Sequence, residues 1–257
     1  MLISSIVFSY KTISMRVIIP AAGRGTRLQP LTLFSPKCMV DINGKPLLYY
    51  LLITLKHFAI DEVVLVTGYK SDMIEDYISG KPEFPAVKFI HNDQFDKTNS
   101  IVSLSLTRHL WDTDFCIIDS DLLIRPKLFA DLIALKDTCL VVDNSKDFGE
   151  IDMKVNVVNG RLINMDKGLL RKDTNGKFSG ISRWANGAAK ALSLSIEKFV
   201  GHNQTNVWYE NAIRDIANDV ILPVSACSSD FCCEIDTATD YERAIQFATK
   251  WQGEWSI

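Results

Sequence analysis

Apolar residues in the first 145 positions form short runs that alternate with longer stretches of helical spacing. The runs are β-branched, end at polar or glycine residues, and predict buried strands at 16–20, 62–69, 87–92, 115–121 and 139–144. The stretches between them predict helices at 46–58, 71–78, 100–110 and 126–136. Strands that alternate with helices in this way predict a mostly parallel sheet with helices on both faces.

The pattern changes after about residue 145. Asn159 and Gly160 separate two alternating runs, which predicts a β-hairpin. Thr237 and Asp240 have the spacing of a helix cap and predict the start of the last helix. The remaining predicted elements are strands at 178–186, 220–226 and 231–236 and helices at 188–200, 208–219 and 237–251.

The chain reads as one domain. Its 257 residues contain no internal repeat and no linker rich in proline or serine. We therefore expect a single α/β domain over residues 15–257, with a doubly wound, mostly parallel sheet and an inserted hairpin subregion. Residues 1–14 read as an N-terminal extension to which the sequence assigns no role.

Charge and composition exclude some classes of function. The formal net charge of -3 argues against general nucleic-acid binding, which needs a pervasive basic surface. The six cysteines show no paired C-x-x-C spacing, so we expect reduced thiols in a cytoplasmic protein. No apolar run approaches the ~18 residues that cross a bilayer, and we expect no membrane insertion.

A glycine turn with positive charge follows the first predicted strand. Gly23 and Gly25 stand among Arg24, Arg27 and Lys37. Glycines let backbone N–H groups approach an anion, and the cations add charge-assisted hydrogen bonds to phosphate oxygens. The third glycine of the dinucleotide-binding fingerprint is replaced by Leu28, and the chain has no P-loop. The turn therefore favours a polyphosphate held by cationic side chains.

The segments PAAGRGTRLQPLT, SPK and GKPLLYY resemble the signature of the nucleotidyltransferase family that makes NDP-sugars and CDP-alcohols. The resemblance implies a Rossmann-like fold with a nucleotide-binding part at about 15–145 and an acceptor-binding part at about 146–257. It also implies catalytic roles for Lys37, near the α-phosphate, and for Arg27, near the β- and γ-phosphates. The implied nucleotide-binding residues are Ala21, Ala22, Gly23, Arg24, Gly25, Thr26, Arg27, Lys37, Gly68, Asn99 and Ser100.

Carboxylates at two predicted strand ends indicate a metal ion. Transfer of a nucleotide unit to an acceptor phosphate brings anions together, and Mg²⁺ neutralises that repulsion with one or two protein carboxylates. The resemblance assigns catalytic Asp121, in IDSD, and Asp236, in EIDTATDY, as ligands of Mg²⁺. Asp119 and Glu234 are candidates to assist. The acceptor phosphate is already ionised, so the reaction requires no general base.

The segment HNDQFDKTNSIVSL resembles choline-phosphate and phosphonate cytidylyltransferases, which favours CTP as the donor. The acceptor would be a small phosphorylated or phosphonate compound: phosphocholine-like, an aminoethylphosphonate, a phosphorylated amino acid or amide, or a polyol phosphate. Aromatic and charged residues on the acceptor side of the resemblance are Lys154, Lys167, Trp184, Trp208, Tyr209 and Glu210.

Three other interpretations stay open at this point. A sugar-1-phosphate nucleotidylyltransferase using UTP, dTTP or GTP is the main alternative, although the chain lacks a glutamine-rich base loop. A catalytically silent homologue is disfavoured because Arg27, Lys37, Asp121 and Asp236 are all present. A dinucleotide oxidoreductase is disfavoured by Leu28. The sequence also leaves a homodimer open.

Overall fold

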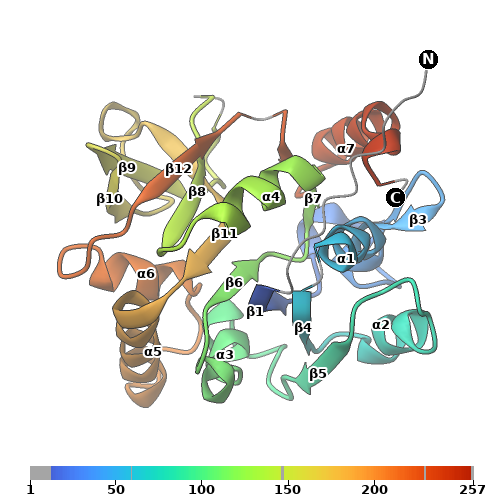
Figure 1. The fold of residues 1–257 in the computed structure, drawn as a ribbon, viewed down its shortest axis with the longest axis horizontal. Helices are drawn as coiled ribbons and strands as arrows, with labels where there is room; N and C mark the ends of the chain where they lie inside the picture. Colours follow the sequence, from blue (N-terminus) through green and yellow to red (C-terminus); the bar gives the residue numbers. More distant parts are fainter. Residues whose placement is uncertain (1–12, 59, 146–147, 229, 256–257) are drawn as a thin grey trace.

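The computed structural model describes residues 13–58, 60–145, 148–228 and 230–255. Residues 1–12, which form most of the predicted N-terminal extension, lie outside these ranges, and so does the question of their role. Within them, a nine-stranded sheet runs through the molecule, with β9 (Lys154–Val158) and β10 (Arg161–Met165) at one end and β5 (Val87–His91) at the other (Figure 1). No helix in these ranges is long and apolar enough to cross a bilayer.

The first half of the chain builds a parallel sheet. The central strand β1 (Ile13–Pro20) pairs in parallel with β4 (Ile60–Thr67) on one side and with β6 (Phe115–Ile118) on the other. Strand β5 (Val87–His91) extends the sheet beyond β4. The chain thus forms β4 and β5 on one side of β1 and then returns to form β6 on its other side. Ligands in such sheets bind where the strand order reverses, which here is the carboxyl ends of β1 and β6.

The second half adds antiparallel strands around β11 (Gly176–Trp184), which pairs with β6, β8 and β9. The other strands are β2 (Asp41–Ile42), β3 (Lys45–Pro46), β7 (Leu122–Ile124), β8 (Cys139–Asp143), β9 (Lys154–Val158), β10 (Arg161–Met165), β12 (Val224–Cys227) and β13 (Cys232–Glu234).

Helices cover both faces of the sheet, as the sequence predicts. Alternate residues of β1 explain why: Val17 and Ile19 pack against α1, α2 and α4, whereas Ile18 packs against α3, α5 and α6. The helices are α1 (Leu47–His57), α2 (Ser71–Ile78), α3 (Ser100–Ser105), α4 (Pro126–Ala134), α5 (Asn186–Gly201), α6 (Glu210–Ile216) and α7 (Ala238–Lys250). Short 3-10 turns span Thr26–Leu28, Lys37–Met39, Arg108–Leu110, Arg171–Asp173 and Gln252–Glu254.

Several local predictions are confirmed and others are corrected. Asn159 and Gly160 have φ values of 52° and 73° and join β9 to β10 in a hairpin, as predicted. The helix predicted at 100–110 is divided, because α3 ends at Ser105 and a 3-10 turn follows. Pro46 is not the first helical residue: its backbone is extended and pairs with Asp41, so α1 begins one residue later.

The structure corrects the prediction that Trp184 binds the acceptor. The last residue of β11, it is 0 % exposed and belongs to the apolar cluster under α5 and α6. Its Nε1 donates to Ser182 Oγ at 2.8 Å, which satisfies the indole N–H inside the core. An aromatic residue in a strand has the same sequence pattern whether it packs in the core or lines a pocket.

Replacing Trp184 by alanine should therefore destabilise the fold by about 3–5 kcal/mol, the usual result of leaving a large cavity. For a chain of this size the melting temperature should fall by more than about 6 °C. Trp208→Ala is the matched control, since Trp208 is 43 % exposed and should change the melting temperature little. Wild-type melting of Trp184→Ala would contradict the core assignment.

Candidate active site

A cavity of about 260 Å³ opens at the carboxyl ends of β1 and β6. Loops from three places in the sequence line it: the glycine turn after β1, the acidic turn after β6, and the segment from β5 to α3. The second half of the chain contributes Lys167, Glu234 and the segment 208–210. The cavity therefore lies at the crevice that the strand order defines.

The glycine turn is held in a conformation that requires glycine at one position. Gly25 has φ 63°, and a Cβ there would lie 2.8 Å from the Cβ of Lys37. Thr32 Oγ1 donates to the Gly25 carbonyl at 2.7 Å, and the backbone of Tyr69 donates to the Ala22 carbonyl at 3.0 Å. The bare Gly25 backbone lets the stem of Lys37 pass into the cavity.

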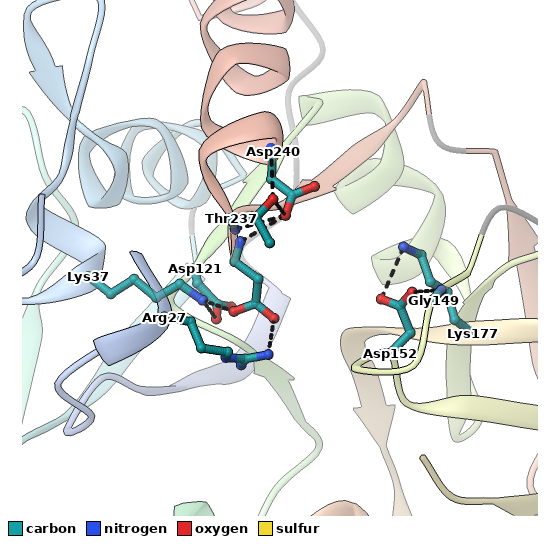
Figure 2. Close-up of polar contacts among 9 residues, drawn as sticks. Arg27, Lys37, Asp121, Gly149, Asp152, Lys177, Thr237 and Asp240 are labelled. Carbon is teal, nitrogen blue, oxygen red and sulfur yellow. Dashed lines mark hydrogen bonds and ion pairs between the residues drawn. The ribbon is translucent and has the colours of Figure 1, made fainter. Parts of the chain in front are cut away.

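Lys37 joins two carboxylates from distant parts of the chain. Its Nζ lies 2.5 Å from Asp121 Oδ2 and 2.5 Å from Asp236 Oδ1. Arg27 Nη1 contacts the second oxygen of Asp236 at 2.7 Å, and Figure 2 shows Arg27, Lys37 and Asp121 pointing toward one another. Although burial opposes ionisation of each group, the pairing raises the pKa of Lys37 and lowers the pKa of Asp236.

The acidic groups around Lys37 have the composition of a site for a hard divalent cation. Oxygens of Asp121, Glu234 and Asp236 lie within 4.8 Å of one another. Asp121 Oδ1 is buried and has no hydrogen-bond partner among the described residues. Burial, together with the neighbouring Asp121 and Asp236, raises the pKa of Glu234 to about 8. An unpartnered oxygen in a crowded carboxylate cluster fits the all-oxygen ligand set of Mg²⁺.

The predicted helix cap fixes Asp236 in place. Asp240 Oδ2 accepts from the backbone N–H groups of Asp236 and Thr237, at 3.2 and 2.9 Å. Thr237 Oγ1 accepts in return from the Asp240 N–H at 3.2 Å, which completes a capping box at the start of α7 (Figure 2). The carboxylate of Asp236 is thereby held at the junction between β13 and α7.

Lys167, Trp208, Tyr209 and Glu210 line the far end of the same cavity. Lys167 Nζ lies 4.2 Å from the centre of the Trp208 ring, a cation–π contact. The Tyr209 hydroxyl donates to Asp119 Oδ1 at 3.2 Å. Burial is the main reason that the pKa of Asp119 lies well above its ordinary value and that of Glu210 rises to about 7.

Two polar residues connect the start of α3 to the segment 208–210. Asn99 Oδ1 accepts from the Ser100 N–H at 2.7 Å and caps α3. Ser100 Oγ accepts from the backbone N–H of Tyr209 at 3.1 Å. Both residues line the cavity, as does Asn92, which the sequence analysis missed. Asn92 follows β5 directly, so its position at the carboxyl end of a parallel strand was the available signal.

Some of the predicted site residues do not line this cavity. Arg24 stacks over the rings of Tyr69 and Phe95, at 5.4 and 5.7 Å. Gly68 is a close-packing position, because a Cβ there would lie 2.7 Å from Phe95 Cβ. Lys154 instead donates to the backbone carbonyl of Lys167. Four further predicted residues do not line the cavity: Ala21, Thr26, Trp184 and Asp236. Asp236 nevertheless contacts the lining residue Lys37 through an ion pair.

The comparison with known protein families agrees with this geometry. Residues 16–154 match the family model described as Nucleotidyl transferase. The chain belongs to the nucleotidyl transferase family, which confirms the resemblance found in the glycine-turn segments.

Individual relatives are similar over most of the chain. A choline-phosphate cytidylyltransferase from Haemophilus influenzae is 27 % identical over 238 residues, which cover 91 % of this chain and 98 % of that protein. The solved structure of the CTP:phosphocholine cytidylyltransferase LicC from Streptococcus pneumoniae has a TM-score of 0.76 and 25 % identity, and covers 91 % of this chain and 99 % of that one. A UDP-glucose pyrophosphorylase structure, with a TM-score of 0.78 and 16 % identity over 93 % of this chain and 99 % of that one, shares the fold.

Gly25→Ala should weaken nucleotide binding by about ten-fold or more, because the added methyl group meets the Lys37 stem and a positive φ is unfavourable for alanine. Binding of nucleoside triphosphates, followed by calorimetry, measures the effect. Gly201→Ala is the control, since nothing lies within 4 Å of a Cβ there. Equal affinities of the two variants would show that the turn does not depend on its glycine.

Proposed function

We propose that this protein is a divalent-metal-dependent cytidylyltransferase. It transfers CMP from CTP to a small phosphorylated or phosphonate acceptor and releases pyrophosphate. The observation that carries the proposal is the content of one cavity, which is lined by Arg27, by the ion pair of Lys37 with Asp121, and by Lys167. The choline-phosphate cytidylyltransferases, similar over 89 % and 91 % of this chain, support CTP and a non-sugar acceptor.

The cationic residues bind the triphosphate. Arg27 and Lys37 pair with carboxylates in the absence of substrate, and phosphate oxygens replace some of those contacts when CTP binds. The backbone N–H groups around Gly23 and Gly25 contribute further donors. Lys37 stays protonated at neutral pH because its pKa is raised, so its charge is available as negative charge develops at the α-phosphate.

The carboxylates hold the metal ion. Asp121 and Asp236 would be its protein ligands, with Glu234 beside them. A bound Mg²⁺ neutralises the phosphate oxygens and the charge on the leaving pyrophosphate. Lys37 keeps the two aspartates together until then, which reduces the repulsion between buried like charges.

The acceptor supplies its own nucleophile. An oxygen of the acceptor phosphate or phosphonate forms a bond to the α-phosphorus of CTP, and the bond from that phosphorus to the bridging oxygen of pyrophosphate breaks. The oxygen is ionised near neutral pH, so no side chain has to remove a proton. Lys167 would attract the acceptor phosphate, and catalysis would rest on positioning and electrostatic stabilisation.

Pyrophosphate release with Mg²⁺ tests the proposal directly. CTP, UTP, GTP, dTTP and ATP are each combined with phosphocholine, phosphoethanolamine, aminoethylphosphonate, glycerol phosphate and glucose 1-phosphate. We expect turnover confined to CTP with a non-sugar acceptor. Preferred use of UTP, dTTP or GTP with a sugar 1-phosphate would keep the family and overturn the proposed donor and acceptor.

Asp121→Asn and Asp236→Asn should each remove the stabilisation that Mg²⁺ gives the wild-type protein. A ligand that binds only the folded state raises the free energy of unfolding by about 2.7 kcal/mol when its concentration is 100 times its Kd. That increase corresponds to a rise in melting temperature of several degrees. Asp131→Asn is the control, because Asp131 pairs with Lys127 on the exposed face of α4. If Mg²⁺ still raises the melting temperature of both site variants, these residues are not its ligands.

A further inference from the structure

The first turn of α6 contains two buried side-chain oxygens that have no partner among the described residues, Glu210 Oε2 and Asn211 Oδ1. Glu210 is only 9 % exposed, yet it lines both the main cavity and a smaller one of about 40 Å³. Asn211 lines the smaller cavity, which shares Lys167, Trp208 and Glu210 with the main one. The two oxygens therefore lie beside a cavity that shares part of its lining with the main one.

Donors close by are engaged elsewhere. Lys167 Nζ stacks on the Trp208 ring and forms no ion pair with Glu210, although its charge partly offsets the burial that raises the pKa of Glu210. Arg214, one turn along α6, pairs with Asp166, and the Tyr209 hydroxyl donates to Asp119. A buried acceptor without a donor destabilises a protein, and more so if it is charged. Such a pair is retained where a ligand supplies the missing N–H or O–H groups.

The aromatic residues here do not form an open cage for a quaternary ammonium. Tyr209 is 1 % exposed and its hydroxyl is bonded. The Trp208 ring already carries the ammonium of Lys167, so this aromatic face is not open to a quaternary ammonium. A trimethylammonium group also has no N–H with which to satisfy Glu210 and Asn211. The smaller cavity has a few times the ~10–15 Å³ that one water requires, which suits a compact polar group.

We propose that the acceptor carries a primary ammonium group that enters this smaller cavity and donates N–H hydrogen bonds to Glu210 and Asn211. This inference rests on the proposed transfer of CMP and narrows its acceptor to an amino-alkyl phosphate or phosphonate. Glu210 and Asn211 are then specificity-determining residues: they distinguish an amine with N–H groups from its fully methylated counterpart. Lys167, between the two cavities, would attract the phosphate end of the same molecule.

Binding to the full chain, with Mg²⁺ and a non-hydrolysable CTP analogue present, tests the inference. Phosphoethanolamine and phosphocholine differ only by three N-methyl groups, and calorimetry compares their affinities. We expect phosphoethanolamine to bind at least ten-fold more tightly. Glu210→Gln should lower its affinity about ten-fold or more and change that of phosphocholine little, because only the primary ammonium donates to the carboxylate.

Glu242→Gln, at an exposed glutamate of α7, is the matched control and should retain both affinities. Equal binding of the two compounds, tighter binding of phosphocholine, or binding of neither overturns the inference. If Glu210→Gln fails to fold, the wild-type comparison alone decides. Binding of the CTP analogue, measured in the same experiment, separates these outcomes from failure of the proposed function, in which CTP itself would not bind.

Discussion

The site depends on one electrostatic constraint: the half-buried Asp121 and the buried Asp236 lie side by side with a cation between them. Lys37 meets that requirement, at 2.5 Å from each carboxylate. The three residues are 84 and 199 positions apart in sequence, so one ammonium connects the turn after β1, the turn after β6 and the start of α7. The same cation positions the groups that would face the triphosphate and the metal, which makes folding of the site and its chemistry parts of one arrangement.

That constraint extends into the backbone. The Lys37 stem passes Gly25 at a distance that no Cβ allows, and the Asp236 carboxylate is fixed by a capping box rather than by a flexible loop. Rigid supports of this kind reduce the reorganisation required when charge moves during a reaction. The segment 208–211 is built differently, since Trp208 is exposed and one side-chain oxygen each of Glu210 and Asn211 has no partner among the described residues.

The parallel half of the fold was predictable because the local spacing of apolar residues indicates its strands and helices. The runs at 16–20 and 62–69 became β1 and β4, and the Asn159–Gly160 pair became a hairpin turn. The antiparallel strands on β11 could not be placed in the same way, because strand partners are distant in sequence and leave no local trace. Within the site, motif residues such as Lys37, Asp121 and Asp236 do lie together. Trp184 was misassigned because burial of a strand residue depends on its tertiary neighbours. Asn92 was missed although it stands in the segment HNDQFDKTNSIVSL, because a motif position does not show which side chains line a cavity.

The hydrogen bond from the Tyr209 backbone to Ser100 Oγ has a consequence for how the site could change. Together with the bond from the Asn99 N–H to the Thr205 carbonyl at 2.9 Å, it attaches the segment that begins α3 to the segment that presents Trp208, Glu210 and Asn211. Under the proposed function, substitutions in 208–211 would alter which acceptor is selected without moving Gly25, Lys37 or Asp121. Such a protein could then accept a different small molecule through changes to a few side chains in one short helix, with its phosphate-binding turn unchanged.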